Sequence, residues 1–308
     1  MDKFKPSSSL FRVVHCKEFA PFKKYIIAPR GFRIVMQVYQ IKHLKWFFPI
    51  DQDVTAHSLS VMYERCHNGE RIYHHFEKDV GMYSFIIGNN RPFVLVLPGG
   101  GYGDVCSIVE GFPIAVRLNE LGYNAFVGQY SVGKEAKYPK PQKDVSSFLN
   151  YIIEHASELN IDTNNYGILG CSAGGHLAAS WGTKVHGYEK YGLPKPGIVM
   201  LAYPVITMGP YTHKGTKKNL IDDNKELEGL LSIEKQVDKD FPKIYIWQCD
   251  HDKVVPYQNT LLMVETLNKH NVKYEHLLVS GNAHGWGLAK DTAADGWLEN
   301  ALQLWNKY

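Results

Sequence analysis

The feature that most constrains the fold is a regular alternation, from Phe93 onward, of short apolar runs and longer stretches of helix length. The runs are rich in aromatic or β-branched residues and are bounded by Gly, Pro or Asn, which is typical of buried strands. They occupy residues 93–97, 124–130, 166–169, 197–203, 243–249 and 274–279. The stretches of helix length are residues 109–121, 142–158, 173–184, 258–270 and 293–307. This alternation predicts an α/β fold with a mostly parallel central sheet and helices on both faces.

Two parts of the chain depart from this alternation. Residues 1–90 are irregular and rich in aromatic residues and His, with few helical repeats. We predict that they form an N-terminal extension, as edge strands or a cap packed on the core formed by residues 91–308; 32–41 and 82–87 are the candidate antiparallel edge strands. Residues 207–241 are longer than most connections between strands, so we predict a functional cap or insertion there. A disordered surface loop is the alternative for that segment.

The composition of the 308 residues excludes several classes of protein. Hydrophobic residues make up 44% and the net charge is +3, with Lys and Arg scattered, which is ordinary for a globular chain and argues against nucleic-acid binding. No apolar run approaches the ~20 residues of a membrane span, and the N-terminus lacks the apolar core of a signal peptide. Five cysteines without C-x-x-C spacing argue against a disulfide framework or a zinc site. We expect a cytoplasmic protein with no membrane partner, no metal and no cofactor; a homo-oligomer is compatible with the sequence.

A candidate nucleophile lies between the third apolar run and a segment dense in small residues. Residues 170–174 read GCSAG, which fits G-x-S-x-G, and the context is strand, sharp turn and helix. A nucleophile elbow needs this context, because the strained turn projects the serine hydroxyl from the sheet edge and the glycines allow a close strand–helix approach. We predict Ser172 as the nucleophile. A glycine-rich turn with an incidental serine is the alternative.

A second glycine-rich loop directly follows the first apolar run. Residues 98–102 read PGGGY. Such a loop can cradle a phosphate, but no G-x-G-x-x-G or G-K-[ST] pattern follows. Its other use is an oxyanion hole, because only glycine lets the backbone approach a substrate so closely. We predict that the N–H groups of Gly100, Gly101 and Ala173 form an oxyanion hole, with a flexible turn as the alternative.

An acid and a base are expected after later strands, in that chain order. Asp250 and Asp252 both follow the run that ends at Cys249. We favour Asp252, which precedes the VVP turn into the next helix, with Asp250 as a hydrogen-bonding neighbour. His284 is the one histidine in the loop after the last apolar run, so we predict it as the general base.

Four residues near these motifs are predicted to bind the substrate: Tyr102, Cys171, Pro204 and His213. His213 lies in the insertion, and Pro204 lies just before it, where it could wall an acyl pocket. For Cys171, an inert buried thiol is the preferred reading, since only thiolates in electropositive surroundings react.

Several blocks together carry a family resemblance over roughly residues 90–308. They read LPGGGYG, YSVG, GILGCSAGGHLAAS, LAYPVITMG, DHDKVVPYQNT and SGNAHGWGLA. The chain resembles the acetyl-esterase and xylan-esterase-like branch of the α/β hydrolases, which is related to the hormone-sensitive-lipase and prolyl-oligopeptidase-like groups. It departs from the HGGG form of the glycine loop, because Pro98 stands in place of the histidine.

The resemblance implies an α/β-hydrolase catalytic domain over residues 91–308 and an activity. The expected reaction is hydrolysis of short-chain acyl esters, with acetyl first and sugars as candidate alcohols, through an acyl-enzyme. The partner expected is therefore a small-molecule ester. A serine peptidase or an acyltransferase would use the same triad, so both stay open at this point. A non-catalytic ligand-binding homologue is the alternative from another class.

Overall fold

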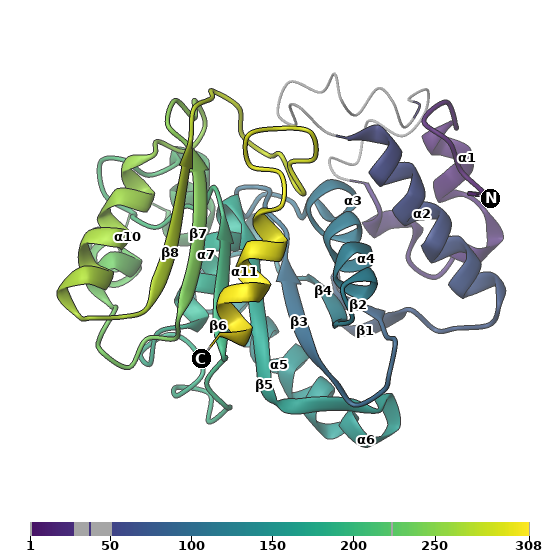
Figure 1. Ribbon diagram of the computed structural model, residues 1–308, viewed down its shortest axis with the longest axis horizontal. Helices are drawn as coiled ribbons and strands as arrows, with labels where there is room; N and C mark the ends of the chain where they lie inside the picture. The colour runs from purple at the N-terminus through teal and green to yellow at the C-terminus, as the bar shows by residue number, and fades with distance from the viewer. Residues whose placement is uncertain (1, 28–36, 38–50, 223, 308) are drawn as a thin grey trace.

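One sheet runs through the whole molecule (Figure 1). The computed structural model describes residues 2–27, 37, 51–222 and 224–307. Within these ranges the sheet has eight strands in the order β1-β2-β4-β3-β5-β6-β7-β8. The strands are β1 (Tyr73–Glu77), β2 (Val80–Phe85), β3 (Arg91–Leu97), β4 (Asn124–Gln129), β5 (Ile161–Cys171), β6 (Ile198–Ala202), β7 (Ile244–Cys249) and β8 (Tyr274–Val279). The strands from β4 to β8 pair in parallel, whereas β1 and β2 are antiparallel.

Each face of the sheet has its own apolar core, because successive strand side chains point to opposite faces. In β3, Val94 and Val96 belong to one cluster of buried residues, while Phe93 and Leu95 belong to the other. The first cluster includes residues of α2 (Gln52–His67), α4 (Phe112–Glu120) and α11 (Trp297–Asn306). The second includes residues of α5 (Lys140–Glu154), α7 (Ser172–Trp181) and α10 (Gln258–Lys269). A mostly parallel sheet between two helical layers confirms the predicted α/β architecture.

The N-terminal part adds two edge strands to the sheet and a helix, α2, that packs on α4. β2 matches the predicted strand at 82–87, shifted by two residues. The predicted strand at 32–41 lies outside the described residues apart from Gln37, which forms an isolated antiparallel bridge with Ser9. The described segment before α2 contains α1 (Leu10–Val14), η1 (Lys17–Phe19) and η2 (Lys23–Tyr25). Residues on both sides of position 90 contribute to the first apolar cluster.

Helix α2 was not foreseen, because half of its buried face is polar. Thr55, Ser58 and Ser60 lie on the buried face beside Leu59 and Met62. The Ser58 hydroxyl donates to the Thr55 carbonyl oxygen at 2.9 Å, so the helix satisfies this buried donor internally. Small hydroxyl side chains can therefore occupy a buried helix face without producing the apolar periodicity that identifies a helix in a sequence.

The helix predicted at 109–121 is divided in two. α3 (Ser107–Glu110) ends at Gly111, and α4 begins at Phe112 with a proline in its first turn. A Cβ on Gly111 would lie 2.6 Å from Val127 Cγ1, so only glycine fits where the chain turns against the sheet. Proline favours the first turn of a new helix. Within the described residues, the remaining helical elements are η4 (Gly133–Glu135), α6 (Ala156–Leu159), α8 (Lys214–Ile221), α9 (Lys225–Leu230) and η5 (Ile233–Lys235).

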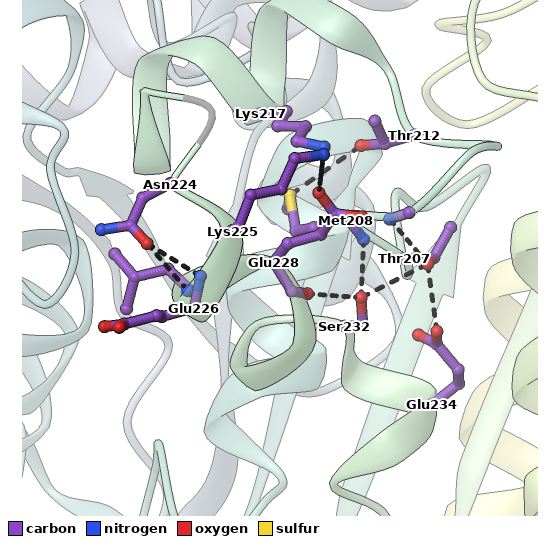
Figure 2. A network of polar contacts seen from close by, with 12 residues as sticks. Thr207, Met208, Thr212, Lys217, Asn224, Lys225, Glu226, Glu228, Ser232 and Glu234 are labelled. Atoms are coloured by element: carbon purple, nitrogen blue, oxygen red, sulfur yellow. Dashed lines mark hydrogen bonds and ion pairs between the residues drawn. The ribbon is translucent and has the colours of Figure 1, made fainter.

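Residues 207–241, the insertion, contain α8, α9 and η5, joined by a polar network that Figure 2 shows. The Ser232 hydroxyl accepts the Met208 N–H at 3.0 Å and donates to the Glu228 carbonyl oxygen at 2.7 Å. The ammonium of Lys217 lies 2.7 Å from a Glu228 carboxylate oxygen. These contacts fold the end of α9 back onto the start of the insertion.

The structure also shows the state of the cysteines and tests the described residues for metal-binding clusters and membrane-spanning helices. Five free thiols are present: Cys16, Cys66, Cys106, Cys171 and Cys249. Within the described ranges, no group of three or more His, Cys, Asp or Glu residues is arranged as a metal ion would need. None of the helices in the same ranges combines the length and the apolar character required to cross a bilayer.

Candidate active site

Ser172 lies at a strained turn between β5 and α7. Its φ of +53° is in the left-handed region, which is unfavourable for a residue with a Cβ and is found where a functional site requires it. Gly174, in the first turn of α7, touches the end of β3: a Cβ there would lie 2.0 Å from the Leu97 carbonyl oxygen. This contact holds the start of α7 against the carboxyl edge of the sheet, where Ser172 is placed.

A chain of hydrogen bonds joins Ser172, His284 and Asp252, which the sequence predicted as a set. The distance from His284 Nε2 to Ser172 Oγ is 2.8 Å, and that from His284 Nδ1 to Asp252 Oδ2 is 2.7 Å. Asp252 follows β7 and His284 follows β8, so the carboxyl ends of parallel strands bring all three together. Because a carboxylate accepts only, Nδ1 carries the proton and Nε2 accepts from the serine hydroxyl.

Asp252 is held by four donors and is shielded from solvent. Its Oδ1 accepts the N–H groups of Val254 at 2.8 Å and Val255 at 3.0 Å. Its Oδ2 accepts from His284 and from Gln248 Nε2, the latter at 3.3 Å. The Asp252 side chain has 0% of its surface exposed. This arrangement fixes the orientation of the carboxylate and, through it, that of the imidazole.

Asp250, two residues before Asp252, binds the backbone of the loop that carries His284. Its Oδ1 accepts the Gly281 N–H at 2.9 Å and lies 2.7 Å from His251 Nδ1. Hydrogen bonding to the Gly281 N–H, followed by that to His251, lowers the pKa of Asp250 below its ordinary value. Asp250 therefore acts on the backbone at the start of the loop and not on the His284 ring.

The glycine loop after β3 passes directly beside Ser172. A Cβ on Gly99 would lie 2.8 Å from the Ser172 Cβ. Gly100 has a φ of +129°, and a Cβ there would lie 2.1 Å from the Asp104 carbonyl oxygen. In the part of the chain that the structure describes, the N–H groups of Gly100, Gly101 and Ala173 have no hydrogen-bond acceptor. Unsatisfied N–H groups beside a serine nucleophile are what an oxyanion hole needs.

Helix α8 of the insertion, with the preceding residue His213, contacts the same glycine loop. Asn219 Nδ2 donates to the Gly101 carbonyl oxygen at 2.9 Å. His213 Cε1 lies 3.4 Å from the place that a Cβ on Gly101 would take. His213 Nδ1 accepts the Thr216 N–H at 3.3 Å, so its Nε2 carries the proton. Burial, and then the proximity of His284, lowers the pKa of His213 and keeps its ring neutral.

Comparison with known proteins identifies the family. A family model described as BD-FAE matches residues 87–192. The acetyl ester-xyloside bifunctional hydrolase from Caldicellulosiruptor lactoaceticus superposes with a TM-score of 0.66 at 32% identity, over 73% of this chain and 86% of that structure. The chain belongs to the acetyl-esterase and xylan-esterase-like family of α/β hydrolases.

Two curated relatives of this α/β hydrolase are much longer proteins. Endo-1,4-beta-xylanase B of Butyrivibrio fibrisolvens is 35% identical over 218 residues, which are 67% of this chain and 34% of the relative. The acetylxylan esterase of Xylanibacter ruminicola is 30% identical over 53% of this chain and 34% of its own length. The chain thus spans about a third of the length of each relative.

Three of the four residues that the sequence predicted to bind the substrate are buried. Tyr102 and Cys171 are 0% exposed, and Pro204 packs with its Cβ 2.6 Å from the place of a Cβ on Gly175. Contact of these residues with a substrate stays a prediction. Burial raises the pKa of the Cys171 thiol well above its ordinary value, in keeping with an inert thiol. His213 is the one of the four that lies partly exposed, beside the glycine loop.

Tyr102 also connects the glycine loop to α7, the helix that begins at Ser172. Its hydroxyl lies 3.0 Å from His176 Nδ1, while His176 Nε2 lies 2.8 Å from the Leu231 carbonyl oxygen. Since a carbonyl oxygen only accepts, Nε2 donates and Nδ1 accepts from the tyrosine. Burial lowers the pKa of His176 to about 4, so the ring stays neutral.

The sequence reasoning missed a buried polar pair beside the site, Glu110 and Tyr203. Glu110 is 2% exposed and Tyr203 is 1% exposed. The available signal was the segment SIVEGFPIAV, in which a single charged residue stands in a stretch that is otherwise apolar. A charge on a buried helix face is costly unless it has partners, and it is therefore a candidate for a function.

Proposed function

We propose that the protein is a serine carboxylesterase that removes small acyl groups, acetyl first, from esters of sugars. The observation that carries the proposal is the hydrogen-bonded series Ser172–His284–Asp252, with Ser172 in a left-handed turn. A serine next to a histidine that is itself oriented by a carboxylate is the arrangement of an activated nucleophile.

The proposed reaction has two halves. His284 Nε2 takes the proton of Ser172 as the hydroxyl oxygen attacks the acyl carbonyl carbon, and Asp252 stabilises the imidazolium. The N–H groups of Gly100, Gly101 and Ala173 stabilise the negative oxygen that forms. The C–O bond to the alcohol then breaks, and the alcohol leaves with the proton held by His284. Water, activated by His284, hydrolyses the acyl-enzyme and returns the serine.

Two observations support a small acyl group and a sugar alcohol. Ser172 is only 8% exposed, and the His284 side chain is also 8% exposed, so access to the nucleophile is narrow. Relatives of this chain are named as an acetylxylan esterase, a xylanase and an acetyl ester-xyloside hydrolase. The proposal extends the substrate class in those names to this chain.

Hydrolysis of 4-nitrophenyl acetate and of acetylated xylo-oligosaccharides by the purified protein tests the proposal, beside a Ser172→Ala control. We expect turnover of both substrates by the wild type, loss of turnover in the variant, and labelling of Ser172 by a fluorophosphonate probe. A folded wild-type protein that neither hydrolyses an ester nor takes up the probe would reject the esterase assignment. Hydrolysis of nitrophenyl acetate without any acetylated sugar would reject only the sugar part.

A further inference from the structure

Glu110 is a buried carboxyl group at the C-terminal end of α3 that forms no ion pair among the described residues. Its Oε2 accepts the Gly99 N–H at 2.7 Å, and its Oε1 lies 3.0 Å from the Tyr203 hydroxyl. A buried carboxylate without a cationic partner destabilises a fold relative to an apolar side chain of similar size. A contribution to stability therefore does not explain why a carboxyl group occupies this buried position, whereas a role at the neighbouring site does.

Tyr203 extends the contact of Glu110 to the loop that carries His284. The Tyr203 hydroxyl accepts the Gly287 N–H at 2.9 Å. The ring of Tyr203 stands edge-on to the imidazole of His284, with centroids 4.8 Å apart and planes at 66°. Glu110 and Tyr203 thus connect Gly99 of the glycine loop with Gly287 of the histidine loop. Gly287 follows His284 in the chain, whereas the Asp250 contact lies before it.

Glu110 and His284 also lie close enough for their charges to interact. Burial raises the pKa of Glu110, while the proximity of His284 and the bonds from Gly99 and Tyr203 oppose that rise. Coulomb attraction is mutual, so a negative charge on Glu110 stabilises a positive charge on the His284 ring. The other titratable groups around these two residues are thiols, phenols, one imidazole and one carboxylate: Cys106, Cys171, Tyr130, Tyr203, His213 and Asp252.

We propose that Glu110 is a positioning residue that holds the oxyanion loop and the histidine loop in register and stabilises the imidazolium of His284 by its negative charge. The inference rests on the proposed function and deepens it by adding a second carboxylate to the site. Unlike Asp252, Glu110 reaches the histidine only through space and through Tyr203, so it changes the energy of proton transfer without taking part in the transfer.

The test is the pH dependence of kcat/KM for nitrophenyl acetate in Glu110→Gln, compared with the wild type. Glutamine keeps the shape but removes the charge, and one of the two donors then faces an amide N–H₂. We expect kcat to fall about tenfold or more, by the loss of one charge-assisted hydrogen bond. We expect the acidic limb of the profile to move to lower pH by about half a unit or more, because the imidazolium formed in the reaction loses a negative neighbour.

Glu234→Gln is the matched control. Glu234 also has a pKa raised by burial, and it accepts from the Thr207 hydroxyl at 3.0 Å within the insertion (Figure 2). We expect wild-type kcat and an unmoved acidic limb in this variant. A similar change in both variants would show a general effect of losing a buried carboxylate and would overturn the inference.

Two further results would overturn the role of Glu110. Glu110→Gln with wild-type kcat, or with lower kcat but an unmoved acidic limb, contradicts the proposed electrostatic effect. If Glu110→Gln does not fold, Tyr203→Phe decides, because it removes the link to Gly287 and leaves the Gly99 contact; wild-type kcat in that variant rejects the connection. A wild-type protein without esterase activity would reject the proposed function, which is a different outcome from any of these.

Discussion

Replacing Asp252 by asparagine should reverse the tautomer of His284. The two backbone donors, Val254 and Val255, require an oxygen at the Oδ1 position, so the amide nitrogen must take the Oδ2 position. There it meets His284 Nδ1, which lies 2.7 Å from Oδ2 and now has to accept. The proton moves to His284 Nε2, and the ring donates to the nucleophile in place of accepting from it.

The loss of a general base in the correct tautomer costs ~10⁴-fold in turnover in other triads, equivalent to about 5 kcal/mol in activation free energy. The amide nitrogen also faces Gln248 Nε2, a second donor, so we expect the free energy of unfolding to fall by about 1–3 kcal/mol. The assay is kcat/KM for nitrophenyl acetate at slightly alkaline pH, with urea unfolding to show that Asp252→Asn is folded.

Asp250→Asn is the matched control, because Asp250 binds the Gly281 N–H and touches no atom of the His284 ring. Loss of about one ordinary hydrogen bond there should reduce kcat/KM by about tenfold or less. A folded Asp252→Asn protein within tenfold of wild type, or a larger loss in Asp250→Asn, would refute the assignment of the acid.

Three other predictions concern the pocket, acidification and the elbow. With narrow access to the nucleophile, kcat/KM should fall from two-carbon to eight-carbon nitrophenyl esters; a steady rise, as expected if each methylene gained roughly 0.8 kcal/mol of burial, would indicate an open groove. Burial lowers the pKa of both His74 and His176 to about 4. On acidification, the unfolded chain therefore binds protons at these histidines at a higher pH than the folded protein does. Stability should therefore drop between about pH 6.5 and pH 4, by roughly 1 kcal/mol per pH unit for each histidine; a melting temperature that stays constant on acidification would contradict this. Gly174→Ala should abolish activity or folding, since the new Cβ would lie 2.0 Å from the Leu97 carbonyl oxygen. Gly229→Ala in α9 is the control, because open space surrounds that glycine. In a thermal melt this variant should be neutral or stabilised by about 0.5–1 kcal/mol.

Most of the parallel sheet was predictable, because the strands inside it, such as β4, β6 and β7, are buried on both faces and therefore appear as short apolar runs. The six predicted runs correspond to β3–β8, with ends that differ by a few residues. Helix α2 was not predictable from periodicity, since hydroxyl side chains such as Ser58 replace apolar ones on its buried face. The break at Gly111 was also missed, because it depends on a contact with Val127 from another strand.

The hydrogen-bonded set at the site was accessible from the sequence for a related reason. Ser172, Asp252 and His284 each lie a few residues after an apolar run, and the carboxyl ends of parallel strands meet at one edge of the sheet. Local patterns therefore predicted which residues would meet. They did not predict that Tyr102 would be buried, since its hydroxyl is bound by His176, which lies 74 residues away in the chain.

By itself, the sequence determined the α/β class, the strand order along the chain and the three residues that meet at the sheet edge, because each is encoded in a run of neighbouring residues. Only the tertiary structure decided which polar groups are shielded from water and what they contact. Glu110 is separated by 93 residues from Tyr203, and no local pattern relates the two. Burial and hydrogen bonding between distant segments set charge and orientation at the site, and these arise only when the loops of several strands pack together.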